Sequence, residues 1–388
     1  MEIVKILFWI VTFIILYTFI GYGALVWLLV KIKEWRHKPQ TFPITEEYPD
    51  VTLLIAAYNE EDIIAEKMAN CRALEYPKDK LHIVWVTDGS SDHTPDLLRT
   101  YPENTVLHEP ARRGKTAALN RAMEQVHTPF VVMTDANTEL NAECIYRIIR
   151  RFDEPRVGCV AGEKKVRVEG DSAAAEEGVY WKYESVLKNL DDRLCSTMGA
   201  AGELIAIRRA LWVPIPDGTL GDDMIISMGV LRKGYKIGYC RTAWASETPS
   251  AGIAEERKRK VRLGACGFQN TVALRDLMNP FRYGMAAFQF VSHRVIRWVL
   301  TPSCLVLAFV LNAVLVCMGA PTLYTVCMAL QALFYLAAAI GNVLDSKGIR
   351  SVFHLPYFFV FANFTTFAGF RYWLHFDGNA AWEKAKRA

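Results

Sequence analysis

Apolar segments without formal charge lie near both ends of the chain. Residues Ile6–Val30 contain no Asp, Glu, Lys or Arg, and as a helix rising about 1.5 Å per residue they would reach roughly 37 Å, enough to cross a bilayer core. Trp298–Leu344 is also uncharged and is interrupted at Gly319-Ala320-Pro321, which predicts a helical hairpin. A third uncharged stretch covers Ser351–Phe370. The pattern predicts a multi-pass protein of the cell membrane.

The charges beside these segments predict their orientation. Lys31, Lys33 and Arg36 directly follow the first apolar segment, which places that flank in the cytoplasm and the N-terminus outside. A third full span after the hairpin would leave the basic tail outside, so we expect the last apolar segment to be re-entrant or to lie in the interface. The predicted division is a membrane helix over 1–30, a cytoplasmic domain over 31–280, an amphipathic interface helix over 281–297, membrane helices over 298–374 and a basic tail over 375–388.

The middle of the chain alternates short apolar runs with helical patterns. Strands are predicted at Val51–Ala57, His82–Thr87, Asn104–His108, Phe130–Thr134 and Val157–Ala161. Helices are predicted between them at Glu60–Leu74, Thr94–Tyr101, Gly114–Val126 and Ala142–Phe152. This alternation predicts an α/β domain with a mostly parallel, doubly wound sheet, in which ligands bind at the carboxyl ends of the strands.

Composition and motif searches exclude several classes of function. The 388 residues carry 45 basic and 41 acidic side chains, a net charge of only +4, which gives no support for binding nucleic acid. The nine cysteines form no C-x-x-C pair, so neither a zinc site nor a disulfide scaffold is indicated. No G-x-G-x-x-G fingerprint is present, and Glu109 stands where a P-loop ending at Gly114-Lys115-Thr116 needs glycine.

Polar groups follow three of the predicted strands. The first strand is followed by Tyr58-Asn59-Glu60, the second ends in Asp88-Gly89-Ser90-Ser91-Asp92, and the fourth is followed by Asp135-Ala136-Asn137. Carboxylate and amide oxygens spaced this way suit Mg²⁺ or Mn²⁺, although an Asp/Asn turn is the commoner explanation. Gly221-Asp222-Asp223 precedes a helical pattern and is typical either of a helix cap or of a carboxylate that acts as a general base.

Taken in order, these motifs resemble those of one enzyme family. The full set is Ala57-Tyr58-Asn59-Glu60, Asp88-Gly89-Ser90-Ser91-Asp92, Gly114-Lys115-Thr116-Ala117-Ala118-Leu119-Asn120, Asp135-Ala136-Asn137, Gly199-Ala200-Ala201-Gly202 and Gly221-Asp222-Asp223. It resembles the membrane-embedded family 2 glycosyltransferases, which include hyaluronan, cellulose, chitin and poly-N-acetylglucosamine synthases. The resemblance covers nearly the whole chain and implies a GT-A-like nucleotide-diphospho-sugar transferase domain inserted between transmembrane helices.

The resemblance also implies roles for individual residues. The nucleotide of a UDP-sugar would be held by Tyr58, Glu60 and Asp88, with Lys115 close to it. Asp135 and Asn137 match the D-x-D site for Mg²⁺ or Mn²⁺, with Asn in place of the second acid. Gly199 to Gly202 matches the loop beside the acceptor. Asp223 matches the catalytic base, and Asp222 fills the acidic place before it.

One stretch departs from the pattern of the polymerising members. They carry Q-x-x-R-W, where this chain has Arg259 in place of the glutamine, keeps the arginine as Arg262 and has Leu263 in place of the tryptophan. Arg259 and Arg262 suit contacts to a diphosphate, but the aromatic platform for an acceptor sugar is missing. The alternative for this basic run is a helix that faces solvent or the headgroups of membrane lipids.

Three functions remain open from the sequence. The first is an inverting synthase that extends an exopolysaccharide or capsule-type glycan from a UDP-sugar, with Asp223 as the base. The second is the transfer of a single sugar to a lipid-linked or oligosaccharide acceptor at the cytoplasmic face of the membrane, which Leu263 favours. The third, a non-catalytic membrane protein with a degenerate nucleotide domain, is disfavoured because Asp88, Asp135 and Asp223 are all present.

Overall fold

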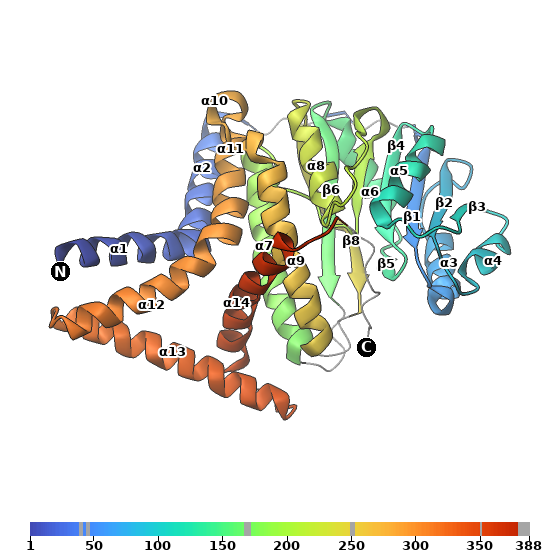
Figure 1. Cartoon of the computed structure of the whole chain (residues 1–388). Helices are drawn as coiled ribbons and strands as arrows, with labels where there is room; N and C mark the ends of the chain where they lie inside the picture. Colours follow the sequence, from blue (N-terminus) through green and yellow to red (C-terminus); the bar gives the residue numbers. More distant parts are fainter. Residues whose placement is uncertain (39–41, 44–46, 167–171, 249–252, 350, 379–388) are drawn as a thin grey trace. The chain divides into compact units, whose positions relative to one another are not determined.

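The chain forms two compact units. The computed structural model describes residues 1–38, 42–43, 47–166, 172–248, 253–349 and 351–378, so most of the predicted basic tail lies outside the described residues. The helical unit comprises Met1–Leu29, Glu169–Val179 and Glu256–His375, and the sheet unit comprises Val30–Val168, Tyr180–Glu255 and Phe376–Ala388. Figure 1 labels the elements of both.

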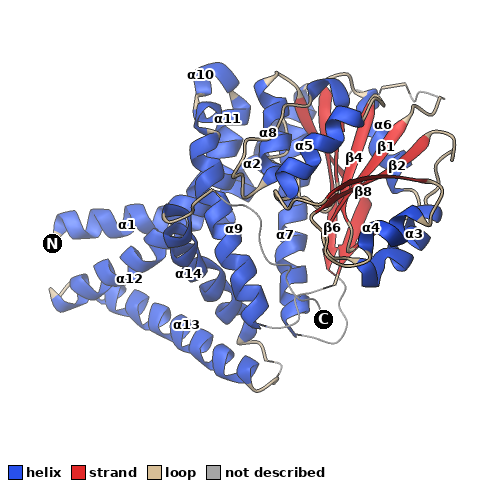
Figure 2. Cartoon of the chain, turned by 45° about the vertical axis from the view of Figure 1, so that its right-hand side comes forward, coloured by secondary structure: helices blue, strands red, loops and turns tan. Residues whose placement is uncertain are grey.

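The sheet unit is built on an eight-stranded sheet with strand order β3-β2-β1-β4-β7-β6-β8-β5. Figure 2 shows the strands in red. The strands are β1 Val51–Ala57, β2 Leu81–Asp88, β3 Asn104–Glu109, β4 Phe130–Asp135, β5 Thr138–Leu140, β6 Val157–Val166, β7 Ile205–Arg208 and β8 Lys236–Glu247. Strands β1 to β4 pair in parallel. Their carboxyl ends therefore lie along one edge of the sheet, where Asp88 and Asp135 are the last strand residues.

The sheet is mixed but mostly parallel, as expected, because only β5 and β7 run against the other strands. Strand β7 runs antiparallel to both β4 and β6, and β5 runs antiparallel to β8, while β6 and β8 are parallel. Strand β7 follows a loop and is not connected to its neighbours by a β-α-β crossover. Such a crossover is what an alternating sequence pattern detects, and β7 has only four residues.

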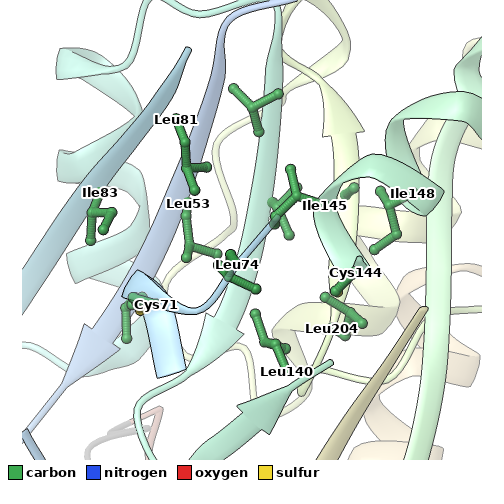
Figure 3. Packing of buried hydrophobic residues seen from close by; sticks show 14 of the residues in the cluster. Leu53, Cys71, Leu74, Leu81, Ile83, Leu140, Cys144, Ile145, Ile148 and Leu204 are labelled. Atoms are coloured by element: carbon green, nitrogen blue, oxygen red, sulfur yellow. The ribbon is translucent and has the colours of Figure 1, made fainter. Parts of the chain in front are cut away.

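Helices cover both faces of the sheet. In the sheet unit these are α3 Ile64–Arg72, α4 Thr94–Arg99, α5 Lys115–Gln125, α6 Cys144–Arg150 and α8 Asp222–Arg232, with α7 Ser172–Leu194 crossing the boundary between the units. Figure 3 shows the core under one face, where Leu53 and Ile83 of the strands lie with Cys71 of α3 and with Cys144 and Ile148 of α6. All of these side chains are buried, and full burial of each large aliphatic one contributes about 1.5–3 kcal/mol.

The helical unit is formed by segments from both ends of the chain. It contains α1 Glu2–Leu16, a π-helical turn Tyr17–Gly21, α2 Tyr22–Arg36 as far as Leu29, α9 Ile253–Ala273 from Glu256 onward, α10 Pro280–Tyr283, α11 Met285–Phe290, a π-helical segment Val291–Leu300, α12 Thr301–Cys317, α13 Thr322–Ser346 and α14 His354–Leu374. Among the described residues three helices are long and apolar enough to cross a membrane: Glu2–Arg36, Met285–Cys317 and Thr322–Ser346. The predicted turn at Gly319-Ala320-Pro321 separates the last two.

The first and last parts of the chain pack together within this unit. Phe8 of α1 is buried against Leu315 of α12 and Tyr324 of α13. The indole N–H of Trp9 donates to the hydroxyl of Tyr324 at 3.2 Å, and the hydroxyls of Thr18 and Thr301 lie 3.0 Å apart. Polar pairs of this kind fix the rotation of apolar helices about their axes.

The interface helix expected over 281–297 is not a separate element. From Met285 the helix continues through the π-helical segment into α12 and ends at Cys317. Its polar residues Ser292 and His293 are buried in this unit, and the hydroxyl of Tyr17 donates to that of Ser292 at 2.8 Å. Internal partners of this kind allow polar residues inside a long apolar helix, so their presence did not mark its end. Helix α14 is not among the three candidate spans, and its placement in the membrane stays a prediction.

Helices α9 and α14 approach each other closely at two glycines. A Cβ built on Gly264 would lie 3.2 Å from the Cα of Thr366, and one built on Gly369 would lie 2.6 Å from the carbonyl oxygen of Val261. The backbones are in contact there, which only glycine allows without displacement.

Candidate active site

Asp88 organises the loop that precedes α5. Its buried carboxylate accepts hydrogen bonds from the backbone N–H groups of Arg113, at 3.1 Å, and Gly114, at 2.6 Å. Gly114 has a φ of +92°, which places it in the region that favours glycine. The carboxylate thereby fixes the first turn of α5, whose first residue is Lys115. In the structure Asp88 therefore shapes the loop next to the predicted nucleotide site.

Lys115 joins the ends of three elements through ion pairs. Its Nζ lies 2.7 Å from Oδ1 of Asp135 at the end of β4 and 3.5 Å from Oδ2 of Asp222 at the start of α8. Burial alone would lower the pKa of Lys115, but the carboxylates of Asp135 and Asp222 outweigh it and raise the pKa above its usual range. Lys115 is therefore a permanent cation between two carboxylates.

Asp223 lies next to this cluster in the first turn of α8. Its Oδ1 accepts from the N–H of Met224 at 2.7 Å. A Cβ built on Gly202 would lie 3.8 Å from Asp223 Oδ2 and 3.8 Å from Lys115 Nζ, so the backbone of the loop Gly199–Gly202, called the glycine loop below, lies against both side chains. Burial, followed by the charges of Asp222 and Glu203, raises the pKa of Asp223 from 3.8 to about 6.

A small pocket in the sheet unit, called the cleft below, is lined by these groups. It is lined by Lys115, Gly202, Asp222 and Asp223 together with apolar side chains of β1, β4, α5 and α8. The structure thus brings together the residues predicted as base, neighbouring acid, nucleotide-side lysine and acceptor loop, and the ion pair to Lys115 adds Asp135. Gly199, with a φ of +93°, lies at the start of the same loop, where the N–H of Ala200 donates to the hydroxyl of Ser227 at 3.2 Å.

The residues predicted to hold the nucleotide lie at the neighbouring strand ends. The guanidinium of Arg112 lies over the ring of Tyr58, 3.9 Å from its centroid. The N–H of Glu60 donates to the hydroxyl of Thr94 at 2.8 Å, which anchors the turn after β1. Arg112 was not predicted to be a site residue, because an arginine beside other basic residues in a loop forms no recognisable sequence motif.

Gly89 brings the Arg112 loop close to the end of β2. It has a φ of +66°, and a Cβ on it would lie 2.6 Å from Cβ of Arg112 and 2.8 Å from its backbone. Gly89→Ala is expected to lower the free energy of unfolding by about 1–2 kcal/mol for the backbone conformation and by about 1–3 kcal/mol more for the clash. Denaturant unfolding measures this loss.

Gly234→Ala is the matched control for this prediction. Gly234 also has a positive φ, +82°, but no atom lies within 4 Å of a Cβ built on it. It should therefore show the conformational cost alone. Equal losses in the two variants would contradict a close contact between Gly89 and Arg112.

Three further predicted site residues belong to other segments of the chain. Arg259 and Arg262 lie on α9 in the helical unit, where Arg259 pairs with Glu256 at 3.4 Å. Their contact with a diphosphate stays a prediction. Asn137 lies in the turn between β4 and β5, two residues after Asp135. The described part of the chain holds no group of three His, Cys, Asp or Glu side chains that would bind a metal unaided.

The structure also shows polar residues around the cleft that sequence analysis missed. The hydroxyl of Thr134 donates to the carbonyl oxygen of Glu203 at 2.7 Å, and the hydroxyls of Thr134 and Thr138 are 2.8 Å apart. The buried Lys67 donates to the carbonyl oxygen of Thr138 at 2.6 Å. These contacts tie the Asp135-Ala136-Asn137 turn to the glycine loop, and only the pairing of distant strands reveals them.

Comparison with known proteins gives relatives of one class. Residues 52–210 match the model of Glycosyl transferase family 2. The poly-beta-1,6-N-acetyl-D-glucosamine synthase of Staphylococcus aureus (strain MSSA476) is 26% identical over 265 residues, which cover 66% of this chain and 63% of that protein. The synthase of the same name from Staphylococcus epidermidis is 26% identical over 149 residues, 37% of this chain and 36% of that protein. The chain thus spans less than two thirds of the length of these relatives.

A solved structure shares the fold over nearly the whole chain. Mannosyltransferase PcManGT from Pyrobaculum calidifontis, in complex with GDP-Man and Mn²⁺, superposes with a TM-score of 0.72 at 22% identity and covers 96% of this chain and 99% of that one. The mixed sheet is therefore the core of a GT-A-like fold, as the resemblance predicted. The chain therefore contains a domain that matches Glycosyl transferase family 2, and this domain includes the strands that end in Asp88 and Asp135.

Proposed function

We propose that this enzyme transfers a sugar from a UDP-sugar to a glycan acceptor, with inversion at the anomeric carbon, in the synthesis of an exopolysaccharide or capsule-type polysaccharide. The observation that carries the proposal is Asp223, a cleft carboxylate whose pKa of about 6 lies close to the pH at which it must work. The names of the staphylococcal relatives support a polysaccharide product. The basic flank after the first apolar segment supports a cytoplasmic catalytic domain.

The chemistry follows from the charges around the cleft. Asp223 removes the proton from an acceptor hydroxyl as that oxygen bonds to the anomeric carbon, and the bond from that carbon to the diphosphate breaks. A single displacement of this kind inverts the configuration. Lys115, permanently charged between Asp135 and Asp222, stabilises the negative charge that develops on the departing diphosphate.

The residues after β4 fit a divalent cation. Asp135 offers a carboxylate and Asn137 an amide oxygen, both hard ligands suited to Mg²⁺ or Mn²⁺. One carboxylate oxygen of Asp135 already contacts Lys115. The protein therefore supplies few metal ligands, and oxygens of the donor's diphosphate would fill the remaining coordination positions. The cation, when bound, neutralises charge on that diphosphate.

The pKa of Asp223 predicts how the rate depends on pH. Only the ionised carboxylate accepts a proton, so kcat is expected to be constant above about pH 7 and to fall towards tenfold per pH unit below about pH 6. Asp222→Asn removes a negative charge that raises this pKa, so it should move the midpoint of the profile to lower pH. A steady-state profile from pH 5 to 8.5 measures both, and a wild-type rate that stays flat down to pH 5 would contradict the assignment.

A second candidate is the addition of one sugar to a lipid-linked or oligosaccharide acceptor. It is favoured by Leu263, half exposed on α9 where polymerising members carry an aromatic platform, and by the match in length to a protein named as a mannosyltransferase.

Product analysis decides between the two candidate functions. The purified enzyme in lipid nanodiscs is given labelled UDP-sugars and GDP-mannose with Mg²⁺ or Mn²⁺ and supplied acceptors. A high-molecular-weight, glycosidase-sensitive product supports the polymerase, and small lipid-linked or oligosaccharide products support single addition.

A further inference from the structure

A buried cation lies behind the glycine loop of the cleft. The side chain of Lys164, on β6, is only 1% exposed, and its Nζ pairs with the carboxylates of Glu203 and Glu247. The ring of Trp181 covers the ammonium, 5.1 Å from ring centroid to Nζ. Buried charges are retained only with partners, and this lysine has two.

The ion triad of Lys164, Glu203 and Glu247 connects separate parts of the sheet unit. Glu247 is the last residue of β8 and lies opposite Thr138 of β5. Glu203 follows Gly202 directly in the loop that leads to β7. The same residue is also held through its carbonyl oxygen by Thr134, the residue before Asp135. Glu203 is thus fixed at both its side chain and its backbone.

The position of Glu203 couples the triad to Asp223. Gly202 packs against Asp223, so movement of Glu203 moves the wall beside the base. The groups that act on the charge of Asp223 are Asp222 of α8, Glu203 of the loop and Lys115 of α5, and Lys115 in turn holds Asp135 of β4. Without Lys164 the charge of Glu203 would act on Asp223 uncompensated.

We propose that Lys164 is a positioning residue for the base. By pairing with Glu203 and Glu247 it holds residues 199–203 against Asp223 and compensates the charge of Glu203, so that the base keeps its orientation. This inference rests on the proposed role of Asp223 in sugar transfer. Lys164 acts through Glu203 and Glu247 and is not required to touch either substrate.

The test measures pH profiles of kcat with full-length enzyme in nanodiscs. Lys164→Met is expected to lower kcat at pH 7 at least tenfold and to move the midpoint of the profile up by about one pH unit. Adding Glu203→Gln to Lys164→Met should return the midpoint towards the wild-type value, whereas adding the matched change Glu247→Gln should not. Titration with UDP should give a Kd within about twofold of wild type in all variants. An unchanged midpoint in Lys164→Met overturns the proposal.

If Lys164→Met does not fold, the single variants Glu203→Gln and Glu247→Gln test the proposal. Glu203→Gln and Glu247→Gln each leave Lys164 with one carboxylate partner. The first should lower the midpoint by about half a pH unit or more and the second should leave it in place, so equal midpoints overturn the proposal. Asp223→Asn and wild type are measured in parallel. An active wild type that Asp223→Asn disables, with no effect of the triad on the midpoint, refutes the role of Lys164 alone. A wild type that transfers no sugar refutes the proposed function.

Discussion

Asp223→Asn is expected to lower kcat for sugar transfer by about 10²–10⁴-fold, the usual contribution of a general base, while the Kd for UDP changes by less than about threefold. The amide occupies the same volume but cannot take the proton of the acceptor hydroxyl. Lys115, Asp135 and Asp88 keep their partners in the variant, because none of them is bound to Asp223. Initial rates with saturating donor, combined with nucleotide titration, measure the two effects separately.

The thermal stability of Asp223→Asn serves as the control for its folding. The folded protein raises the pKa of Asp223 to about 6, so the stability that the protonated form contributes is present at low pH and is lost as the pH rises through about 6. A neutral amide avoids that loss, and the Tm of Asp223→Asn at pH 8 should equal or exceed that of wild type. Parallel loss of transfer and of UDP binding would refute the role of Asp223 as a base.

The second large effect is expected at Asp135. Asp135→Asn should lower the metal-supported rate at least about a hundredfold, because charge stabilisation by a divalent cation is worth several kcal/mol and each 1.36 kcal/mol is a factor of ten. The fold should persist, since Lys115 retains Asp222 as a partner at 3.5 Å. Rates across a Mn²⁺ titration, together with direct Mn²⁺ binding by electron paramagnetic resonance in the presence of UDP, measure the change.

Asn137→Asp is the matched variant for this prediction. It places a second carboxylate in the same turn after β4 and should lower the Mn²⁺ concentration at half-maximal rate several-fold, whereas Asp135→Asn should raise it. Mn²⁺ affinity that is the same in wild type and both variants would show that the cation does not bind in this turn.

Strands with both faces buried were predicted well from the sequence, and pairings fixed by distant segments were not. Strand β1 runs over Val51–Ala57 as predicted, because every position but one is buried and the run is apolar except for Thr52. Strands β5 and β7 have only three and four residues. Strand β8 carries the exposed Arg241 and Thr242 in its middle, which interrupt the apolar pattern. The antiparallel reversal at β7 depends on contacts with β4 and β6 that no local pattern encodes.

Residues of the candidate site were also predictable where a local pattern marks them and not where distant segments meet. Residues at the carboxyl ends of strands, such as Asp88 and Asp135, could be assigned to one edge of the sheet from periodicity alone, and the family resemblance added Asp223. The ion pairs of Lys115 could not be predicted, because they depend on how α5 and α8 meet. Lys164 and Glu203 also escaped notice, since a lysine within a strand and a glutamate after a glycine are common and their pairing spans distant parts of the chain.

The backbone contact between α9 and α14 bears on how the chain is made. Gly369 leaves the ribosome more than a hundred residues after Gly264, and at about 5–20 residues per second α9 is exposed for roughly 5 to 20 seconds before the helix that packs against it exists. During that interval the basic side chains of α9 are not yet packed against α14, and clusters of such side chains are attracted to the anionic headgroups of membrane lipids. The order of synthesis therefore makes the contact between α9 and α14 a late step in the assembly of this unit.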